Sequence, residues 1–264
     1  MNLNTDSDPH YLNRVIPAEG SKKVPAVIQE PDVVPPCEHK GGFFMSIVTP
    51  DGGLTWLGYA LSIIAAIVLI LGAGFLRGKT DSGRKPSTKQ LIFCGVAIAL
   101  AYVASYLKLF NLPFGGSVTL FSMLFICLIG NWYGPKAGIM TGLAFGILQF
   151  LQEPYVLSLF QVCCDYILAF GALGLAGLFW KSKNGLVKGY ILGILARGAF
   201  HTLGGYLYWM DYMPDNFPQA LASLYPIIYN YSYILAEGIL TIIVILLPPV
   251  SKALLTVKKT ASQA

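Results

Sequence analysis

Charged side chains are scarce in this sequence. Only 12% of its residues are Asp, Glu, Lys or Arg, against roughly 25% in a typical soluble domain. Hydrophobic residues make up 55% and gather in helix-length runs. This composition excludes an ordinary soluble domain. It predicts an all-α membrane protein that crosses the lipid bilayer several times.

The cysteine patterns of a disulfide framework or a metal centre are also lacking. The five cysteines are scattered, and four of them lie inside apolar runs. We therefore expect no metal site and no cofactor. The polar, proline-rich stretch 1–53 has neither the apolar core of a cleavable signal nor the arginine pattern of a transit peptide. We expect it to be a disordered N-terminal arm.

Seven apolar runs follow the arm. The first, 54–76, carries no charge and is predicted to be an additional transmembrane helix. A basic linker at 77–89 leads to a membrane domain at 90–250, and a tail occupies 251–264. Within the membrane domain, six helices are expected at 90–107, 118–133, 136–151, 160–180, 187–209 and 226–247.

Lysine and arginine concentrate on one side of the predicted bundle. If the linker is cytoplasmic, 12 of the 18 basic residues lie in cytoplasmic segments, and Lys108 is the only base in the short loops opposite. Basic residues accumulate on the cytoplasmic side of membrane proteins. The sequence thus predicts a cell-membrane protein with its N-terminus outside and its C-terminus in the cytoplasm. The net charge of +5 then needs no nucleic-acid partner to explain it.

Residues 73–80, AGFLRGKT, fit a loose form of the phosphate-binding loop. That motif holds phosphates between a strand and a helix. Here a predicted transmembrane helix precedes it, a polar linker follows, and no second nucleotide motif is found. We reject ATP binding by this segment. If transport is driven by ATP, hydrolysis takes place on another chain.

One acid, Asp165, lies inside an apolar helix-length run, 155–179. A charge in a membrane segment costs on the order of 3 kcal/mol, so it should face a protein interior or a wet cavity and have a partner. His201 and Trp209 on the fifth core helix are expected in the same outer half of the bundle. A polar binding site in this outer half is the resulting hypothesis.

The start of the sixth core helix brings further polar groups to that half, namely Tyr225 and Asn230. Pro226 suits the first helical position, which should leave Tyr225 extended and free to point into a cavity. Deeper in the bundle, Arg197 and Glu237 are expected at similar depth. Since each alone would be an uncompensated charge, we predict that they form an ion pair.

The residues around Asp165 resemble a known family. Tyr155, the following Leu-Ser-Leu-x-Gln, the pair Asp165-Tyr166 and the later Leu-Ala-Gly-Leu-Phe are similar to helix four of one class of membrane receptor. That class is the thiamine-specific substrate-binding (S) component of energy-coupling factor (ECF) vitamin transporters. The resemblance covers roughly residues 90 to 250 and implies a six-helix S-component bundle.

Helices five and six carry the same resemblance. A His followed eight residues later by a Trp, and a Tyr followed five residues later by an Asn, match the family's patterns. The resemblance implies a thiamine-binding site made of Tyr155, Asp165, Tyr166, His201, Trp209, Tyr225 and Asn230.

Two features depart from the family pattern. Asp165 stands where the family usually has a glutamate, so a shorter carboxylate must sit closer to the ligand or act through water. A tryptophan of the first outer loop, expected near Gly116, is missing. Phe114 is the candidate to replace it over the pocket.

The resemblance also implies protein partners. These are a transmembrane coupling subunit and its two ATPase subunits, which hydrolyse the ATP. The first core helix carries small residues at four-residue spacing, which let helices approach closely. In the family such a row docks the coupling subunit, whereas internal packing is the alternative reading. The residues concerned are Gly95, Ala97, Ala99 and Ala101.

Thiamine suits such a site because its thiazolium ring is a permanent cation that a buried carboxylate can compensate. An S component for another vitamin, such as riboflavin, is the first alternative, although an uncharged flavin gains little from an acid. A second alternative is an intramembrane enzyme that uses Asp165 and His201. No nucleophile or metal-ligand motif accompanies that pair in the sequence, so we expect a receptor rather than an enzyme. A channel would need a repeated charged ring or filter, which the sequence lacks.

Overall fold

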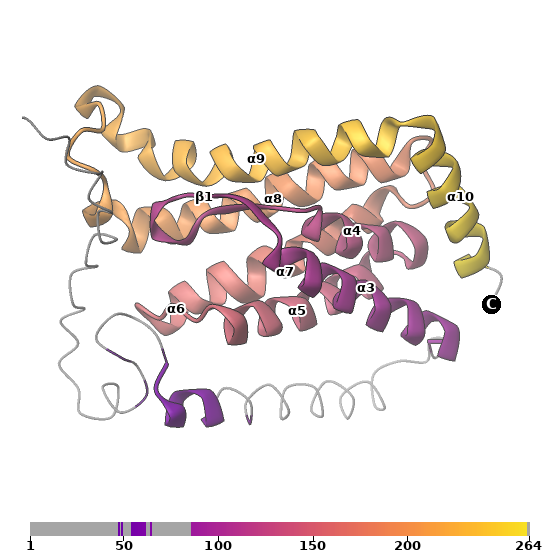
Figure 1. Ribbon diagram of the computed structural model, residues 1–264, viewed down its shortest axis with the longest axis horizontal. Coiled ribbons are helices and arrows are strands. Elements are labelled where there is room, and N and C mark those ends of the chain that lie inside the picture. The colour runs from indigo at the N-terminus through magenta and orange to yellow at the C-terminus, as the bar shows by residue number, and fades with distance from the viewer. Residues whose placement is uncertain (1–46, 48, 50–53, 62–63, 65–85, 263–264) are drawn as a thin grey trace, which may run out of the picture. The chain divides into compact units, whose positions relative to one another are not determined.

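The computed structural model describes residues 47, 49, 54–61, 64 and 86–262 (Figure 1). Six apolar helical segments lie at the six predicted places. They are α3 (Thr88–Tyr106), α4 (Ser122–Tyr133), α5 (Pro135–Gln152), a composite helix at 159–179, α8 (Gly185–Tyr208) and α9 (Tyr225–Leu246). Residues 56–61 begin a helix within the predicted first span. The rest of that span, nearly all of the 1–53 arm and most of the linker lie outside the described residues.

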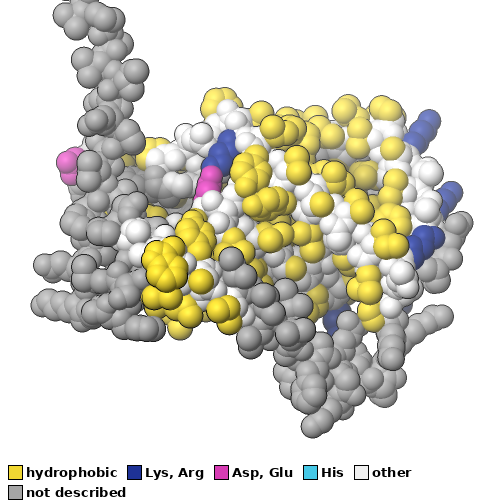
Figure 2. All heavy atoms as spheres, turned by 60° about the horizontal axis from the view of Figure 1, so that its bottom comes forward, with side chains coloured by type: hydrophobic (Ala, Val, Ile, Leu, Met, Phe, Trp, Pro, Cys, Tyr) yellow, Lys and Arg dark blue, Asp and Glu magenta, His cyan; other side chains and the backbone are white. Residues whose placement is uncertain are grey.

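The described helices fit a protein that crosses the membrane several times. Three of them are long and apolar enough to span it, at 88–106, 159–179 and 219–246, and α4 is a shorter apolar helix. Figure 2 shows a broad apolar surface along the bundle, with Lys and Arg side chains gathered at the end where α10 (Pro248–Ser262) lies. Apolar side chains along the length of a bundle contact the lipid hydrocarbon, and basic side chains at its end lie at the membrane surface. The distribution of side chains therefore fits a protein embedded in a bilayer.

The first outer loop is a β-hairpin, which the sequence did not predict. The strands β1 (Lys108–Asn111) and β2 (Ser117–Thr119) pair antiparallel, with the short 3₁₀ turn η1 (Pro113–Gly115) between them. Residue 118, the predicted start of the second core helix, is therefore in β2, and that helix begins only at 122. The predicted break between the first two core helices, at the first outer loop, is confirmed.

The fourth core helix is irregularly wound. It consists of α6 (Leu159–Val162), the π-helical segment η2 (Cys163–Leu168), α7 (Ala169–Ala172) and the 3₁₀ segment η3 (Leu173–Phe179). Glycines let it pack closely on α5: a Cβ added at Gly138 would lie 2.9 Å from the Cα of Gly174. Small residues at such crossings let helix backbones approach where lipid offers no hydrophobic drive.

The start of α9 differs from the prediction for Tyr225. This residue is helical, with φ −51° and ψ −49°, and is the first residue of α9. The 3₁₀ turn η5 (Gln219–Leu224) runs directly into the helix and overrides the preference of a residue before proline for extended backbone. Pro226 in the first turn is confirmed. The side chain of Tyr225 is buried, and its backbone is helical rather than extended.

Glu237 of α9 is buried at the N-terminus of α4. Its carboxylate accepts hydrogen bonds from the backbone N–H groups of Thr119 (2.9 Å) and Met123 (3.3 Å). The Thr119 hydroxyl donates a third at 2.7 Å. The residue before α4, Phe121, gives no side-chain cap. Glu237 therefore supplies the cap from another helix and places its charge at the positive end of the α4 dipole.

The predicted ion pair between Arg197 and Glu237 is wrong. Among the described residues the two form no ion pair, and Arg197 instead donates its Nε–H to His201 Nε2 at 3.3 Å. The Arg197 guanidinium also lies 4.3 Å from the ring centre of Phe170. The prediction failed because it assumed that only a contacting cation could compensate Glu237, whereas hydrogen bonds from Thr119 of β2 and from the backbone of Met123 in α4 hold the carboxylate.

The predicted tail contains a helix that the sequence analysis did not anticipate. α10 crosses the end of the bundle and contacts α3, α4 and α9 (Figure 1). The ammonium of Lys258 donates to Asn131 Oδ1 at 3.0 Å, and the Tyr133 hydroxyl donates to the carbonyl of Ala261 at 3.2 Å. These bonds fix α10 to the end of α4.

Replacing Glu237 with Gln tests its role as the cap of α4. The amide would bring N–H donors against the N–H groups of α4 and remove the charge. We expect the free energy of unfolding to fall by about 2 kcal/mol, the scale for a hydrogen bond to a charged group. Thermal unfolding in detergent would measure it. The control is Glu153→Gln, which removes a half-exposed surface pair with Lys108 and should cost less than about 1 kcal/mol. Equal losses in the two variants would contradict the capping role.

Candidate ligand-binding site

Asp165 lies in the π-helical turn η2 and faces α8. A Cβ added at Gly204 of α8 would lie only 3.1 Å from Asp165 Oδ1, so the glycine makes room for the carboxylate. The Asp165 side chain is 14% exposed. Single π-helical turns inside α-helices are frequent at functional sites. The prediction that this acid faces the protein interior is confirmed.

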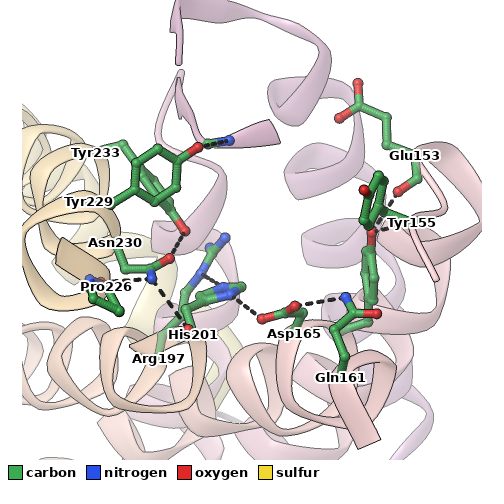
Figure 3. Close-up of polar contacts among 12 residues, drawn as sticks. Glu153, Tyr155, Gln161, Asp165, Arg197, His201, Pro226, Tyr229, Asn230 and Tyr233 are labelled. Atoms are coloured by element: carbon green, nitrogen blue, oxygen red, sulfur yellow. Dashed lines mark hydrogen bonds and ion pairs between the residues drawn. The ribbon is translucent and has the colours of Figure 1, made fainter. Parts of the chain in front are cut away.

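Two side chains hold the Asp165 carboxylate (Figure 3). His201 Nδ1 lies 2.9 Å from Oδ1, and Gln161 Nε2 donates to Oδ2 at 2.8 Å. Gln161 is almost completely buried, and its Oε1 accepts the backbone N–H of Leu157 at 3.1 Å. Because the amide oxygen is occupied in this way, the amide nitrogen must face Asp165. Gln161 therefore orients the acid.

The contacts of His201 define its tautomer. Arg197 donates a hydrogen bond to Nε2, so Nε2 is an unprotonated acceptor and Nδ1 carries the ring hydrogen. Nδ1–H then donates to Asp165. His201 is thus a neutral link between the Arg197 cation and the Asp165 anion. No cation touches the Asp165 carboxylate directly within the part of the chain that the structure describes.

Asn230 connects α9 to this group. Its Nδ2 donates to the carbonyl of Pro226 at 2.9 Å and to that of His201 at 3.3 Å. Its Oδ1 accepts the Tyr233 hydroxyl at 3.0 Å. Both ends of the amide therefore have partners within the protein, and Asn230 bridges α8 and α9. Its predicted contact with a ligand stays a prediction.

Aromatic rings flank the acid on two sides. The rings of Tyr155 and Trp209 stack 4.9 Å apart at an angle of 31°. On α9, Tyr225, Tyr229 and Tyr233 follow one another at four-residue spacing, with ring centres 5.8 and 5.9 Å apart. In Figure 3, Asp165 lies between Tyr229 and Tyr233 on one side and Tyr155 on the other.

Tyr166 has a supporting position. Its hydroxyl donates to the carbonyl of Glu153 at 2.7 Å and accepts the backbone N–H of Tyr155 at 3.1 Å. Its ring packs on Phe150 at 5.0 Å. Tyr166 therefore holds the segment that carries Tyr155.

The hairpin is fastened to α9 by Tyr229. The backbone N–H of Gly116 donates to the Tyr229 hydroxyl at 3.0 Å, and this hydroxyl in turn donates to the carbonyl of Pro113. A Cβ added at Gly116 would lie 2.8 Å from the Tyr229 oxygen and 2.9 Å from the ring of Tyr233. Tyrosine side chains thus fill the space beside Gly116, where the resemblance predicts a tryptophan. The side chain of Phe114 lies outside the described residues.

The structure divides the predicted docking row into two. Gly95 and Ala99 are exposed, whereas Ala97 and Ala101 are buried in the bundle core. Internal packing is therefore the role of the second pair. Only the first pair is on the surface, and its predicted role in docking is unaffected.

Sequence reasoning missed Gln161, Tyr229 and Tyr233 as members of this group. Gln161 stands four residues before Asp165, and the two tyrosines stand four and eight residues after Tyr225. Such spacing places side chains on one helix face. This spacing could be seen in the sequence, but it does not show which hydrogen bonds the three side chains form.

Replacing Tyr229 with Phe should loosen the hairpin tip. The variant keeps the ring but removes the bonds to Pro113 and Gly116. Loss of about 1 kcal/mol for a hydrogen bond should raise amide hydrogen exchange over residues 112–118 about fivefold. The matched control is Tyr231→Phe, which removes a 2.8 Å hydrogen bond to the carbonyl of Leu195 on α8. Equal exchange at 112–118 in both variants would show that Tyr229 does not hold the tip.

Comparison with known proteins identifies the family. The solved structure of ThiT from Listeria monocytogenes shares 27% identity and covers 61% of this chain and 94% of that chain, with a TM-score of 0.49. The thiamine transporter ThiT of Bacillus subtilis (strain 168) is 31% identical over 156 residues, which are 52% of this chain and 77% of the relative. A family model described as thiamine transporter protein matches residues 91–257. The chain therefore belongs to the thiamine transporter protein family, and its described helices form the six-helix core of a multi-pass membrane protein.

Proposed function

We propose that this protein is the thiamine-binding S component of an ECF vitamin importer. Membership of the thiamine transporter family supports thiamine as the ligand. The observation that carries the proposal is the Asp165 carboxylate, largely buried and contacted by a neutral histidine and an amide. A carboxylate without a cation beside it is suited to a cationic ligand.

The thiazolium ring of thiamine supplies that cation. In the proposal it lies near Asp165, and the stacked rings of Tyr155 and Trp209 contribute about 0.5–2 kcal/mol for each cation–π contact. Tyr225 provides a further aromatic face at the start of α9, close to Tyr229. His201 and Asn230 complete the walls from α8 and α9, while Tyr166 and Gln161 hold the groups in place.

The alternatives receive no comparable support. The uncharged flavin of riboflavin would leave the Asp165 charge without a partner. An enzyme built on Asp165 and His201 is not favoured either, since the family is one of transport proteins. No cluster of metal-ligating side chains is found among the described residues.

We further infer that the energy for transport comes from other chains. The partners in this proposal are a transmembrane coupling subunit and two ATPase subunits. The exposed Gly95 and Ala99 are small residues on the lipid-facing side of α3, where a second helix can approach closely. The distribution of basic residues supports a cytoplasmic C-terminus and an outer position for the hairpin.

The Asp165→Asn variant tests the ligand. It keeps the side-chain volume but removes the charge, so thiamine affinity should fall by at least about 2 kcal/mol, the scale for breaking a desolvated charge pair. Titration calorimetry with purified protein would measure it. A neutral pyrimidine analogue that lacks the thiazolium should be affected much less.

Asp211→Asn is the matched control, since Asp211 is an exposed acid on the same side of the bundle. It should leave affinity unchanged. An Asp165→Asn variant that binds thiamine as tightly as the wild type would overturn the ligand assignment and the role of the acid together.

Docking on α3 is tested by Ala99→Trp. The bulky ring should block the coupling subunit and abolish thiamine uptake in cells, while the isolated protein still binds thiamine. Ala97→Trp is the comparison: it overpacks the core, typically by 1–3 kcal/mol, and should lower folded yield. Normal uptake by Ala99→Trp cells would exclude this row as the docking surface.

A further inference from the structure

An apolar groove lies between α3, α4 and α10. It has a volume of about 210 Å³ and no polar lining. Its walls include Val96 and Leu100 of α3, Trp132 of α4, and Leu254 and Val257 of α10. Nothing in the proposed thiamine site uses it, since that site is built around Asp165 and His201.

Only apolar atoms are suited to fill this groove. Water in a cavity needs two to four polar partners, and the lining offers none. The groove is also open to the surroundings, because the side chains of Val96 and Leu100 are 51% and 47% exposed. In a bilayer, this surface of the bundle is in contact with lipid, so an acyl chain is the apolar group that can enter the groove.

A lysine stands beside one end of the groove. Lys89 lies in the first turn of α3, four residues before Phe93, which lines the groove. Residues four apart share a helix face, so Lys89 continues the groove wall toward the helix start. Its side chain is partly exposed.

α10 adds positive charge at the same end. Its sequence contains Lys252, Lys258 and Lys259 and no acid. Figure 1 shows it crossing the end of the bundle, and Figure 2 shows basic side chains at that end. Burial lowers the pKa of Lys258, which bonds to Asn131, whereas Lys252 and Lys259 are exposed. A basic amphipathic helix in this position is typical of a membrane–water interface.

We propose that this groove is a binding site for one anionic phospholipid. An acyl chain lies between α3, α4 and α10, and the headgroup phosphate lies at Lys89, within the positive field of α10. Charge complementarity selects an anionic over a zwitterionic lipid, since each lysine near an anionic surface contributes about 1 kcal/mol. The lipid would fasten α10 to α3, which the described hydrogen bonds do not do.

Native mass spectrometry of the full chain would test the site. The protein would be taken from vesicles of phosphatidylcholine mixed with phosphatidylglycerol, and the retained lipid identified. The wild type should retain phosphatidylglycerol in preference. Lys89→Gln should reduce this preference about fivefold, the factor for 1 kcal/mol. Lys188→Gln, an exposed lysine at the start of α8, should leave it unchanged.

A second pair of variants tests the groove itself. Leu100→Trp fills it from its exposed rim and should strongly reduce retained lipid of both kinds. Leu195→Trp places the same ring at a 43% exposed position of α8 and should not. Elution volume and helical circular dichroism would verify that all variants are folded.

Three outcomes would overturn the proposal. They are retention of both lipids equally by the wild type, equal effects of Lys89→Gln and Lys188→Gln, and unchanged lipid retention by Leu100→Trp. If Leu100→Trp instead spares lipid but prevents binding of the coupling subunit, the groove is a protein contact.

Discussion

A carboxylate inside an apolar helix has to be compensated, and the arrangement of α8, η2 and α9 depends on how this is done for Asp165. The neighbours that meet it are a neutral imidazole and an amide, at 2.9 and 2.8 Å. They satisfy its hydrogen bonds without cancelling its charge. Because Arg197 bonds to His201 and not to Asp165, no cation among the described residues pairs directly with this carboxylate, and its charge is available to a cation from outside the protein. A receptor for a cationic vitamin needs such a group.

Glu237 shows the opposite solution on the same bundle. Its charge is compensated within the protein, by the backbone N–H groups of Thr119 in β2 and Met123 in α4. The bond to Thr119 also fixes the base of the hairpin to α9, and Tyr229 fixes the tip to the same helix. α9 therefore carries one wall of the candidate site and two attachments of the hairpin, while the pair of Lys108 with Glu153 joins β1 to the end of α5. Movement of α9 relative to α8 would move the wall and the loop together.

Much of the fold and of the candidate site could be predicted from the sequence, because the length of an apolar run and the spacing of its polar residues are properties of a single helix. The six core segments and the gathering of Asp165, His201 and Asn230 are of this kind. What could not be read is the direction of a side chain around its helix. Arg197 and Glu237 were placed at one depth, yet Arg197 bonds to His201 on its own helix and Glu237 bonds to Thr119 and Met123. The π-helical turn at Asp165 and the hairpin before α4 depend on tertiary contacts, which no local pattern records.

The small residues of α3 have different environments that depend on the helix face they occupy. Gly95 and Ala99 are exposed, while Ala97 and Ala101, two positions further along, are buried. The apolar groove lies between these faces, at Val96 and Leu100. If the proposed coupling subunit docks on Gly95 and Ala99, it also meets whatever fills the groove, because Val96 and Leu100 each directly follow one of these two residues. Lipid in the groove and a coupling subunit on Gly95 and Ala99 would form one continuous surface, and α3 would then connect the lipid, this subunit and the end of the bundle at α10.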